Sequence, residues 1–209
     1  MIESLALVPW TGVWPHLLGT VLVAYLMGSV PFGLIFAWWA GGGDVRKIGS
    51  GNIGATNVLR TGKRWAAAAT LFFDAAKGYA AVRLASDYGG QVFATFAGLA
   101  VFLGHLYPVW LKFKGGKGVA TFLGVTFAFA PLVATASCMT WLSFAWATRY
   151  SSLAALIAAA ATPFYFLFPA IGATLPAALT GILALFIIFT HRQNIARLIR
   201  GDEPRIRGR

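Results

Sequence analysis

Long apolar stretches alternate with short polar ones along most of the chain. The apolar core of a bilayer is about 30 Å thick, so a helix of about 20 apolar residues can cross it. Apolar stretches of this order cover residues 17–40, 65–85, 91–111, 119–149, 152–170 and 177–191. The pattern predicts an all-α integral membrane protein that forms a single polytopic domain over residues 1–209.

The charged residues lie mostly between these stretches. Only 11% of the 209 residues are charged while 58% are hydrophobic, and the formal net charge is +11. A soluble domain carries about 25% charged residues, so the composition excludes a small water-soluble enzyme, and it excludes a disordered chain as well. The basic residues form three clusters, which are Arg46, Lys47, Arg60, Lys63 and Arg64, then Lys112, Lys114 and Lys117, and finally Arg192, Arg197, Arg200, Arg205, Arg207 and Arg209.

The basic clusters predict the topology. Basic residues that flank membrane helices stay in the cytoplasm, so the N-terminus, which carries Glu3 and no basic residue, is expected outside. Arg149 and the loop over 112–117 are both expected inside, so the stretch between them must cross an even number of times. It is therefore predicted to form two short helices that turn near residues 131–137. The result is seven transmembrane helices, two of them short, with the N-terminus outside and the C-terminus cytoplasmic.

The first cytoplasmic segment is rich in glycine and small polar residues. The glycines allow the backbone to expose several consecutive N–H groups over the run Gly49-Ser50-Gly51-Asn52-Ile53-Gly54. Exposed N–H groups of this kind bind phosphate oxygens. The run is not a dinucleotide-binding fingerprint, because no strand precedes it. The alternative is a solvated, turn-rich loop that serves only topology. Thr56 and Asn57 beside Arg60 favour phosphate binding, because a purely topogenic loop needs no small polar residues.

The second cytoplasmic segment places Lys117 among glycines at the predicted start of a helix. Gly115, Gly116 and Gly118 surround this lysine, and the arrangement again suits an anion, with the ammonium group as a point charge for a phosphate. The spacing of a Walker A loop is absent. His105, at the end of the preceding apolar stretch, is about equally compatible with a structural hydrogen bond and with a catalytic role.

The third segment follows the last apolar stretch. His191, Asn194 and Arg197 recur at about helical spacing, so their side chains can share one face. The alternative is a basic tail that lies on anionic lipid headgroups, which explains the arginines better than it explains the other two residues. Inside the predicted second helix, Asp74 and Lys77 are three residues apart, and we interpret them as an ion pair that holds helices together.

These segments indicate two phosphate-bearing ligands at the cytoplasmic face of the membrane, one of them with a lipid chain. The sequence H-x-x-x-x-D does not occur, because Val21, Trp110 and Ala196 stand five residues after the three histidines. This excludes the soluble-headed acyltransferases that use that pair. No cluster of Asp and Glu offers a site for a catalytic Mg²⁺ ion, so neither a metal nor another cofactor is expected.

Three motifs cover the polar segments: Arg46-Lys-Ile-Gly-Ser-Gly-Asn-Ile-Gly-Ala-Thr-Asn57, Phe113-Lys-Gly-Gly-Lys-Gly-Val-Ala-Thr121 and His191-x-x-Asn194-Ile-x-Arg197-Leu. They resemble the motifs of the bacterial acyl-phosphate:glycerol-3-phosphate acyltransferase family, PlsY, and Asp74-x-x-Lys77-Gly78 is similar to that family as well. The resemblance implies a seven-helix membrane enzyme that transfers an acyl group from acyl phosphate to the 1-hydroxyl of glycerol 3-phosphate. Its products would be lysophosphatidic acid and inorganic phosphate, in the first acylation of phospholipid synthesis.

The resemblance also assigns roles by position. It implies that the catalytic residues are Ser50, Arg60, Lys117, His191 and Asn194. It implies substrate-binding roles for Gly49, Gly51, Asn52, Gly54, Thr56, Asn57, Lys114, Gly115, Gly116, Gly118, Ser152, Arg197 and Glu203. The expected partners are acyl phosphate, glycerol 3-phosphate and membrane lipids, with no nucleic acid. The protein is expected to be a monomer in the bacterial plasma (inner) membrane, with its active site at the cytoplasmic face.

Two alternatives stay open at this point. The hydroxyl proton passes either to the substrate's own phosphate or to His191 acting as a general base. The competing function is a membrane transporter for phosphorylated metabolites, which would also need anion sites. A transporter predicts polar groups at mid-membrane and on both faces, whereas the polar segments of this chain lie on one side.

Overall fold

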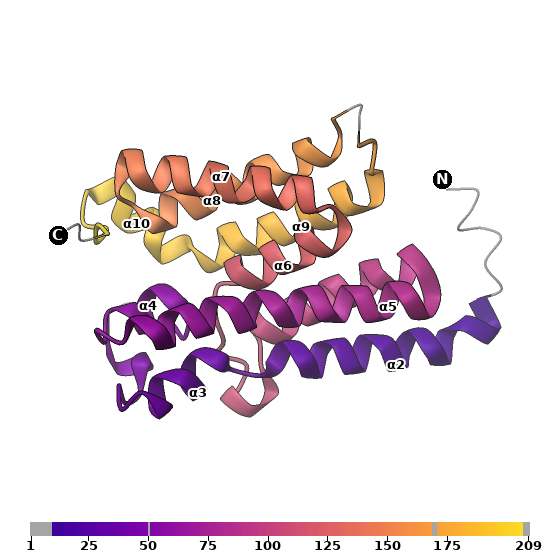
Figure 1. Ribbon diagram of the computed structural model, residues 1–209, viewed down its shortest axis with the longest axis horizontal. Helices are drawn as coiled ribbons and strands as arrows, with labels where there is room; N and C mark the ends of the chain where they lie inside the picture. The colour runs from indigo at the N-terminus through magenta and orange to yellow at the C-terminus, as the bar shows by residue number, and fades with distance from the viewer. Residues whose placement is uncertain (1–9, 50, 169–170, 207–209) are drawn as a thin grey trace.

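The computed structural model describes residues 10–49, 51–168 and 171–206, and within these ranges every regular element is a helix (Figure 1). The all-α prediction is therefore confirmed for the described chain. The α-helices are α2 Trp10–Ser29, α3 Phe32–Trp39, α4 Ala55–Leu59, α5 Arg64–Leu106, α6 Val119–Phe129, α7 Pro131–Thr148, α8 Ser151–Phe166, α9 Thr174–Thr190 and α10 Arg192–Arg200. Two short 3₁₀ turns, η1 Val45–Lys47 and η2 Val109–Leu111, complete the list.

Helices α2 and α3 form one apolar stretch with a break at Pro31, which has no N–H group to continue the helix. The break leaves backbone carbonyl groups without their helical partners, and side chains from elsewhere bind two of them. The indole Nε1 of Trp110 donates to the Ser29 carbonyl at 2.9 Å, and the Lys77 ammonium donates to the Val30 carbonyl at 2.9 Å. The break is thus held by defined partners.

Helix α5 is a hairpin of two arms rather than one rod. The backbone leaves the helical conformation at Gly89 and Gly90, and Gly90 has φ +73°, which favours glycine. His105 lies 3.4 Å from Asp74, although 31 residues of continuous helix would separate them by about 46 Å. Figure 1 shows the ribbon turning back at the end of the molecule where α2 begins. The two arms correspond to the apolar stretches predicted over 65–85 and 91–111.

The long apolar stretch over 119–149 contains two helices, α6 and α7. The break between them is at Ala130, directly before Pro131, which occupies the first turn of α7 as proline commonly does. The break therefore lies one residue before the predicted turn region, and residues 131–137 form the first turns of α7 because Pro131 starts that helix. Helices α7 and α8 pack side by side, and the Ser137 and Thr162 hydroxyl groups form a buried hydrogen bond of 2.7 Å between them.

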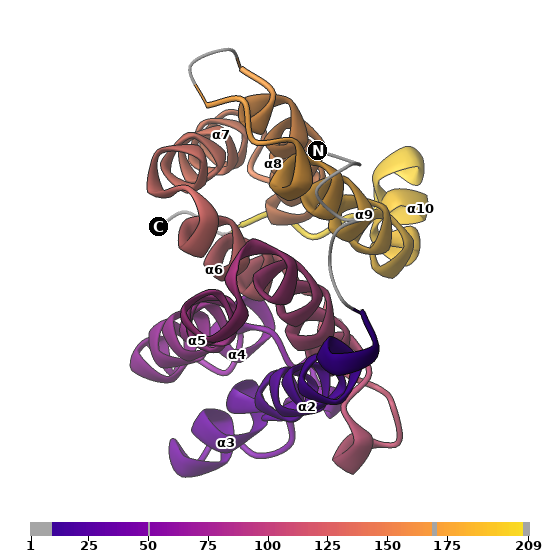
Figure 2. The ribbon, with the colours of Figure 1, turned by 90° about the vertical axis from the view of Figure 1, so that its right-hand side faces the viewer.

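The helices form two groups with α6 between them. Figure 2 shows α2, α3 and α5 on one side and α7, α8 and α9 on the other. The main core joins the groups through fully buried residues from α2, α5, α6 and α9, among them Leu17, Phe102, Phe122, Leu183 and Ile187.

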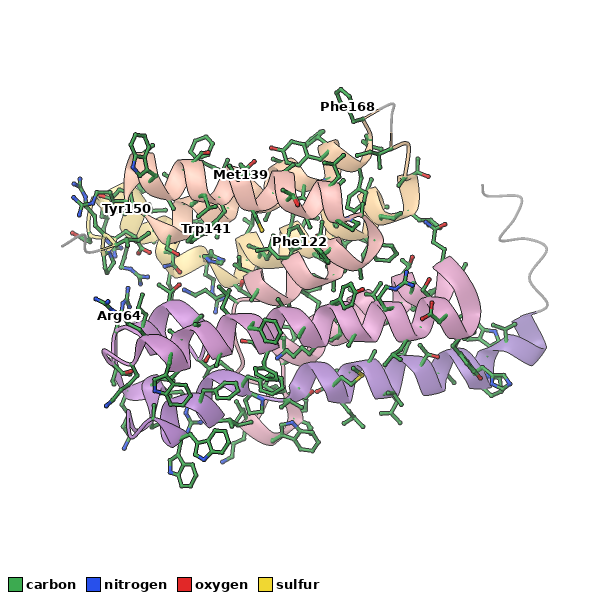
Figure 3. All side chains as sticks on the ribbon, in the orientation of Figure 1. Arg64, Phe122, Met139, Trp141, Tyr150 and Phe168 are labelled. Carbon is green, nitrogen blue, oxygen red and sulfur yellow. The ribbon has the colours of Figure 1, made fainter. Side chains whose placement is uncertain are left out.

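Several helices have the length and apolarity of membrane spans. In the described part of the chain, Gly12–Trp39 and Arg64–Leu111 qualify, and Thr174–Thr190 with Arg192–Arg200 adds a third if this pair, bent by 59°, counts as one span. Helices α6 and α8 are apolar but shorter. The count of seven and the orientation of the termini stay predictions. Figure 3 shows side-chain nitrogen atoms gathered at the end that carries Arg64 and Tyr150, whereas Phe168 lies at the opposite end.

Candidate active site

The second motif forms a tight turn against the last residues of α5. The backbone N–H of Gly115 donates to the Leu106 carbonyl at 2.9 Å, and that of Gly116 donates to the His105 carbonyl at 3.0 Å. A Cβ atom on Gly116 would run into the His105 ring. Gly118 has φ +88° and directly precedes α6, so the predicted loop-to-helix junction is present and Lys117 lies within it.

Lys117, Asn194 and Glu203 form a chain of hydrogen bonds. The Lys117 ammonium donates to Asn194 Oδ1 at 2.6 Å, and Asn194 Nδ2 donates to Glu203 Oε1 at 2.6 Å. The chain joins the start of α6, the first turn of α10 and the segment after α10. Residues from the second and third motifs therefore meet, as their shared assignment to one site predicts.

Glu203 is the acidic centre of this cluster and is buried. Its carboxylate also accepts from Ser152 Oγ at 2.6 Å and from Arg197 Nε at 2.7 Å. Burial alone would raise the pKa of Glu203, but the hydrogen bonds from Ser152, Asn194 and Arg197 and the charge of Arg197 outweigh it and lower the pKa. A charged carboxylate therefore holds three of the predicted site residues.

The ammonium group of Lys117 loses its proton more easily than an exposed lysine does. Burial is the main cause and lowers the pKa of Lys117 to about 8; the negative charge of Glu203 opposes the shift, while the charges of Arg197 and Arg60 add to it. Arg60 directly follows α4. Because its charge acts on Lys117, the first motif lies near enough to the other two to interact with them electrostatically. An anion bound among these cations would favour the charged lysine.

His191 lies just past the last residue of α9 and is buried. Its Nδ1 atom is 2.8 Å from the Ile187 carbonyl oxygen, which can only accept, so Nδ1 carries the hydrogen and Nε2 is the acceptor of the neutral ring. Burial and the charge of Lys117 lower the pKa of His191 to about 4, against the opposing effects of the Ile187 hydrogen bond and of Glu203. The imidazole is neutral at pH 7.

The first motif is a loop organised by two asparagines. The Asn57 amide donates to the carbonyl oxygens of Val45, Ile48 and Asn52 at 2.7, 3.0 and 2.7 Å, and Asn52 Oδ1 accepts from the Gly54 N–H at 3.0 Å. Both side chains were expected to bind substrate, yet these contacts lie inside the loop. The loop has little regular structure of its own, so the two asparagine side chains are needed to hold its backbone in place.

Most of the other predicted site residues lie outside the chain of hydrogen bonds from Lys117 to Glu203. Arg60 is exposed and directs a guanidinium nitrogen to Asn57 Oδ1 at 3.4 Å, above Gly49. Thr56 and Lys114 are exposed, and no contact in the described ranges joins them to the Lys117 cluster. Ser152 was expected to meet the acceptor phosphate, and its hydroxyl binds Glu203. Ser50 lies outside the described residues.

An apolar groove of about 440 Å³ runs beside α9. Its walls are Tyr107, Ile182, Leu185, Phe186 and Phe189. The four α9 residues follow the i, i+3, i+4, i+7 spacing of one helix face. Phe189 is followed by Thr190, which donates to the Lys117 carbonyl at 3.3 Å. The groove therefore begins next to the polar cluster and leads away from it.

Sequence reasoning did not find the buried contact between Asp74 and His105, nor the central place of Glu203. Asp74 was paired only with Lys77, and that ion pair is present at 2.7 Å. A signal for Glu203 was available, because it is one of only six acidic residues and stands in the most basic segment of the chain.

Comparisons with known proteins agree with this architecture. Residues 18–201 match the family described as glycerol-3-phosphate acyltransferase. A protein of that name from Methylorubrum populi is 54% identical over 193 residues, covering 92% of this chain and 94% of the relative. One from Rhodopseudomonas palustris is 52% identical over 189 residues, covering 90% and 95%.

Solved structures show the same fold. The glycerol 3-phosphate form of PlsY (YgiH), an integral membrane glycerol 3-phosphate acyltransferase, superimposes with a TM-score of 0.85 at 43% identity, covering 91% of this chain and 95% of the other. The lysophosphatidic acid form gives 0.82 at 40% identity with the same coverage. The chain belongs to the glycerol-3-phosphate acyltransferase family.

Proposed function

We propose that this chain transfers an acyl group from an acyl phosphate to the 1-hydroxyl of glycerol 3-phosphate, giving lysophosphatidic acid and inorganic phosphate. The observation that carries the proposal is the setting of Lys117. Its partly buried ammonium is held by Asn194 and lies within reach of the charges of Arg60 and Arg197. Several cations around one glycine turn suit phosphate groups, and the adjoining apolar groove suits a lipid chain. Membership in a family of this name supports the same activity.

The proposed reaction needs little covalent chemistry from the protein. An acyl phosphate is a mixed anhydride with a good leaving group, so catalysis consists mainly of positioning and charge stabilisation. The 1-hydroxyl oxygen bonds to the acyl carbon, and the bond from that carbon to the phosphate oxygen breaks. Negative charge moves from the carbonyl oxygen to the departing phosphate. Lys117 and the backbone N–H groups near Asn52 stabilise this charge.

The hydroxyl proton passes to the substrate's own phosphate in this proposal. His191 is the other candidate acceptor, but a base is most effective when its pKa lies near the working pH. Burial holds the pKa of His191 at about 4, and its Nδ1 atom is engaged with Ile187. A phosphate monoester, whose second pKa is about 6, is the stronger base. His191 is then a neutral residue that orders the end of α9 beside Lys117.

The groove beside α9 is the proposed place of the acyl chain. Its α9 wall runs over the eight residues from Ile182 to Phe189, which span about 10 Å of helix. Phe189 is next to Thr190, whose hydroxyl contacts the Lys117 carbonyl. An acyl chain in the groove would therefore present its carboxyl end to the Lys117 cluster.

The same proposal places the protein in the bacterial plasma membrane as a monomer, with seven transmembrane helices and the active site at the cytoplasmic face. The basic clusters support this orientation by the positive-inside rule. Exposed tryptophans also occur near the charged end, and Trp38 and Trp39 close the apolar stretch that α2 began. Tryptophan is enriched where a membrane meets water.

A single assay tests the proposed activity. Purified protein in detergent micelles is incubated with palmitoyl phosphate and radiolabelled glycerol 3-phosphate, and the lipid extract is counted. We expect labelled lysophosphatidic acid. If no labelled lipid forms, while sealed liposomes containing the protein accumulate labelled glycerol 3-phosphate, the chain is a transporter and the proposal is wrong.

A further inference from the structure

We infer that Asp74 and His105 form a buried pair that positions the Gly115–Lys117 turn, so that both residues serve the reaction without touching substrate. The inference rests on the proposed role of Lys117. It adds two positioning residues from the interior of the helix bundle to a site built from the three polar segments.

The pair connects the two arms of α5. Asp74 lies in the first arm and His105 in the last turn of the second, and His105 Nδ1 is 3.4 Å from Asp74 Oδ1. Lys77 lies 2.7 Å from the same carboxylate and donates to the Val30 carbonyl at the break between α2 and α3. Asp74, His105 and Lys77 are 3, 5 and 6% exposed. Asp74 is therefore anchored independently of His105 and can orient its ring.

The ring of His105 in turn supports the glycine turn. It fills the space into which a Cβ atom on Gly116 would project. The carbonyl groups of His105 and Leu106 accept the N–H groups of Gly116 and Gly115. The end of α5 therefore holds the turn in two ways, through these backbone hydrogen bonds and through the contact of the His105 ring with Gly116.

Lys117 directly follows Gly116, so the position of the His105 ring affects where the Lys117 side chain leaves the turn. From the turn, its side chain reaches Asn194 at 2.6 Å. The alternative is that the buried charges only hold the arms of α5 together. Asp74 and Lys77 lie in the same arm and balance each other's charge, so only the contact between His105 and Asp74 could join the arms. The contact of His105 with Gly116 has no place in that explanation.

The test removes the ring and leaves the ion pair intact. We expect His105→Ala to lower kcat by about tenfold to a hundredfold, because a misplacement of about 1 Å costs that much. The alkaline limb of kcat/KM, which reports Lys117, should move to higher pH as the ammonium gains solvent. The other charged groups that face Lys117 are Glu203, Arg197 and Arg60, with neutral His191 beside them, and the substitution leaves all four in place.

A second variant keeps the test decisive if the first is poorly folded. Gly116→Ala should be severe in the wild type, because its methyl group meets the ring, and should cost much less when combined with His105→Ala. Two residues that do not act on each other would give additive losses instead. Additive losses, or an alkaline limb that does not move, would overturn the inference.

Ser137→Ala is the matched control. It breaks the buried hydrogen bond to Thr162 in the α7–α8 pair, so it destabilises the bundle away from the glycine turn. We expect unchanged kcat and an unchanged pH profile per folded molecule. If wild-type protein forms no lysophosphatidic acid, the proposed function fails; if it does and His105→Ala matches Ser137→Ala, only the positioning role fails.

Discussion

Lys117 and Glu203 bind the two ends of the same side-chain amide. Asn194 accepts from the Lys117 ammonium through Oδ1 and donates to the Glu203 carboxylate through Nδ2, both at 2.6 Å. The two charges therefore fix the orientation of the amide, and Glu203 itself is held by Ser152 and Arg197. The position of the ammonium depends on residues from α8, α10 and the C-terminal segment together.

Removal of the Lys117 ammonium should abolish most of the activity. We expect Lys117→Ala to lower kcat by about 10²–10³, the cost of one lost donor to developing negative charge. Turnover of palmitoyl phosphate with radiolabelled glycerol 3-phosphate measures it. Lys63→Ala, which removes an exposed lysine from the same basic end, should retain wild-type turnover. Full activity of purified Lys117→Ala would rule out its catalytic role.

The pH dependence of kcat/KM should report the same lysine. Its pKa is about 8, so the ammonium is charged below pH 8 and loses its proton as the pH rises through that value. We therefore expect kcat/KM, which reflects the free enzyme, to fall above about pH 8. Lys117→Arg should lose this limb, since arginine keeps its charge. A wild-type profile that stays flat to pH 10 would contradict the assignment.

Glu203→Gln should shift that limb and weaken the fold. The charge of Glu203 raises the pKa of Lys117, so its removal should move the alkaline limb below pH 8. The substitution also leaves Arg197 without its ion-pair partner, and we expect a loss of about 1–3 kcal/mol in unfolding free energy, measured by thermal unfolding in detergent. Asp202→Asn is the control, because Asp202 is exposed and pairs with Arg200. Equal behaviour of the two variants would show that Glu203 is not the centre of the cluster.

The acid limb of the kcat/KM profile should show whether the substrate phosphate or His191 accepts the hydroxyl proton. Proton transfer to the substrate phosphate predicts a limb near about pH 6, and His191→Ala should leave it there, even if turnover falls. A general base at His191 would instead give a limb near pH 4, because burial lowers its pKa to about that value, and the substitution would remove it. The measurement is the pH profile of kcat/KM for both proteins between pH 3.5 and about 7, a window that spans these two pKa values.

Much of the fold could be predicted because hydropathy and helix breakers act locally. The break at Gly89–Gly90 lies between two apolar stretches, and Pro131 follows the break at Ala130 that divides the stretch over 119–149. The stretch over 17–40 was predicted as one span, although Pro31 divides it into α2 and α3. The carbonyl groups of Ser29 and Val30 beside this break are bound by Trp110 and Lys77, far away in the sequence. Partners of that kind cannot be read from local periodicity.

The site was predictable in its residues more than in their roles. Glycines beside a cation predicted an anion site at Lys117, whereas Asn194 was predicted from its helical spacing with His191 and from the family resemblance. The two side chains do meet, at 2.6 Å. The inward-facing amide of Asn57 was not predictable, because an asparagine in a glycine-rich loop can face either a ligand or the loop itself. His105 was left undecided for a similar reason. Its neighbour Asp74 comes near only after α5 folds back.

In the proposed reaction an acyl phosphate is the donor, and its phosphate departs as the acyl group moves. Its most direct test follows lysophosphatidic acid and inorganic phosphate together in one reaction of purified protein with palmitoyl phosphate and glycerol 3-phosphate. We expect one inorganic phosphate for each lysophosphatidic acid, with both lost together in Lys117→Ala. Phosphate release without lysophosphatidic acid, or equal product from the variant, would contradict it.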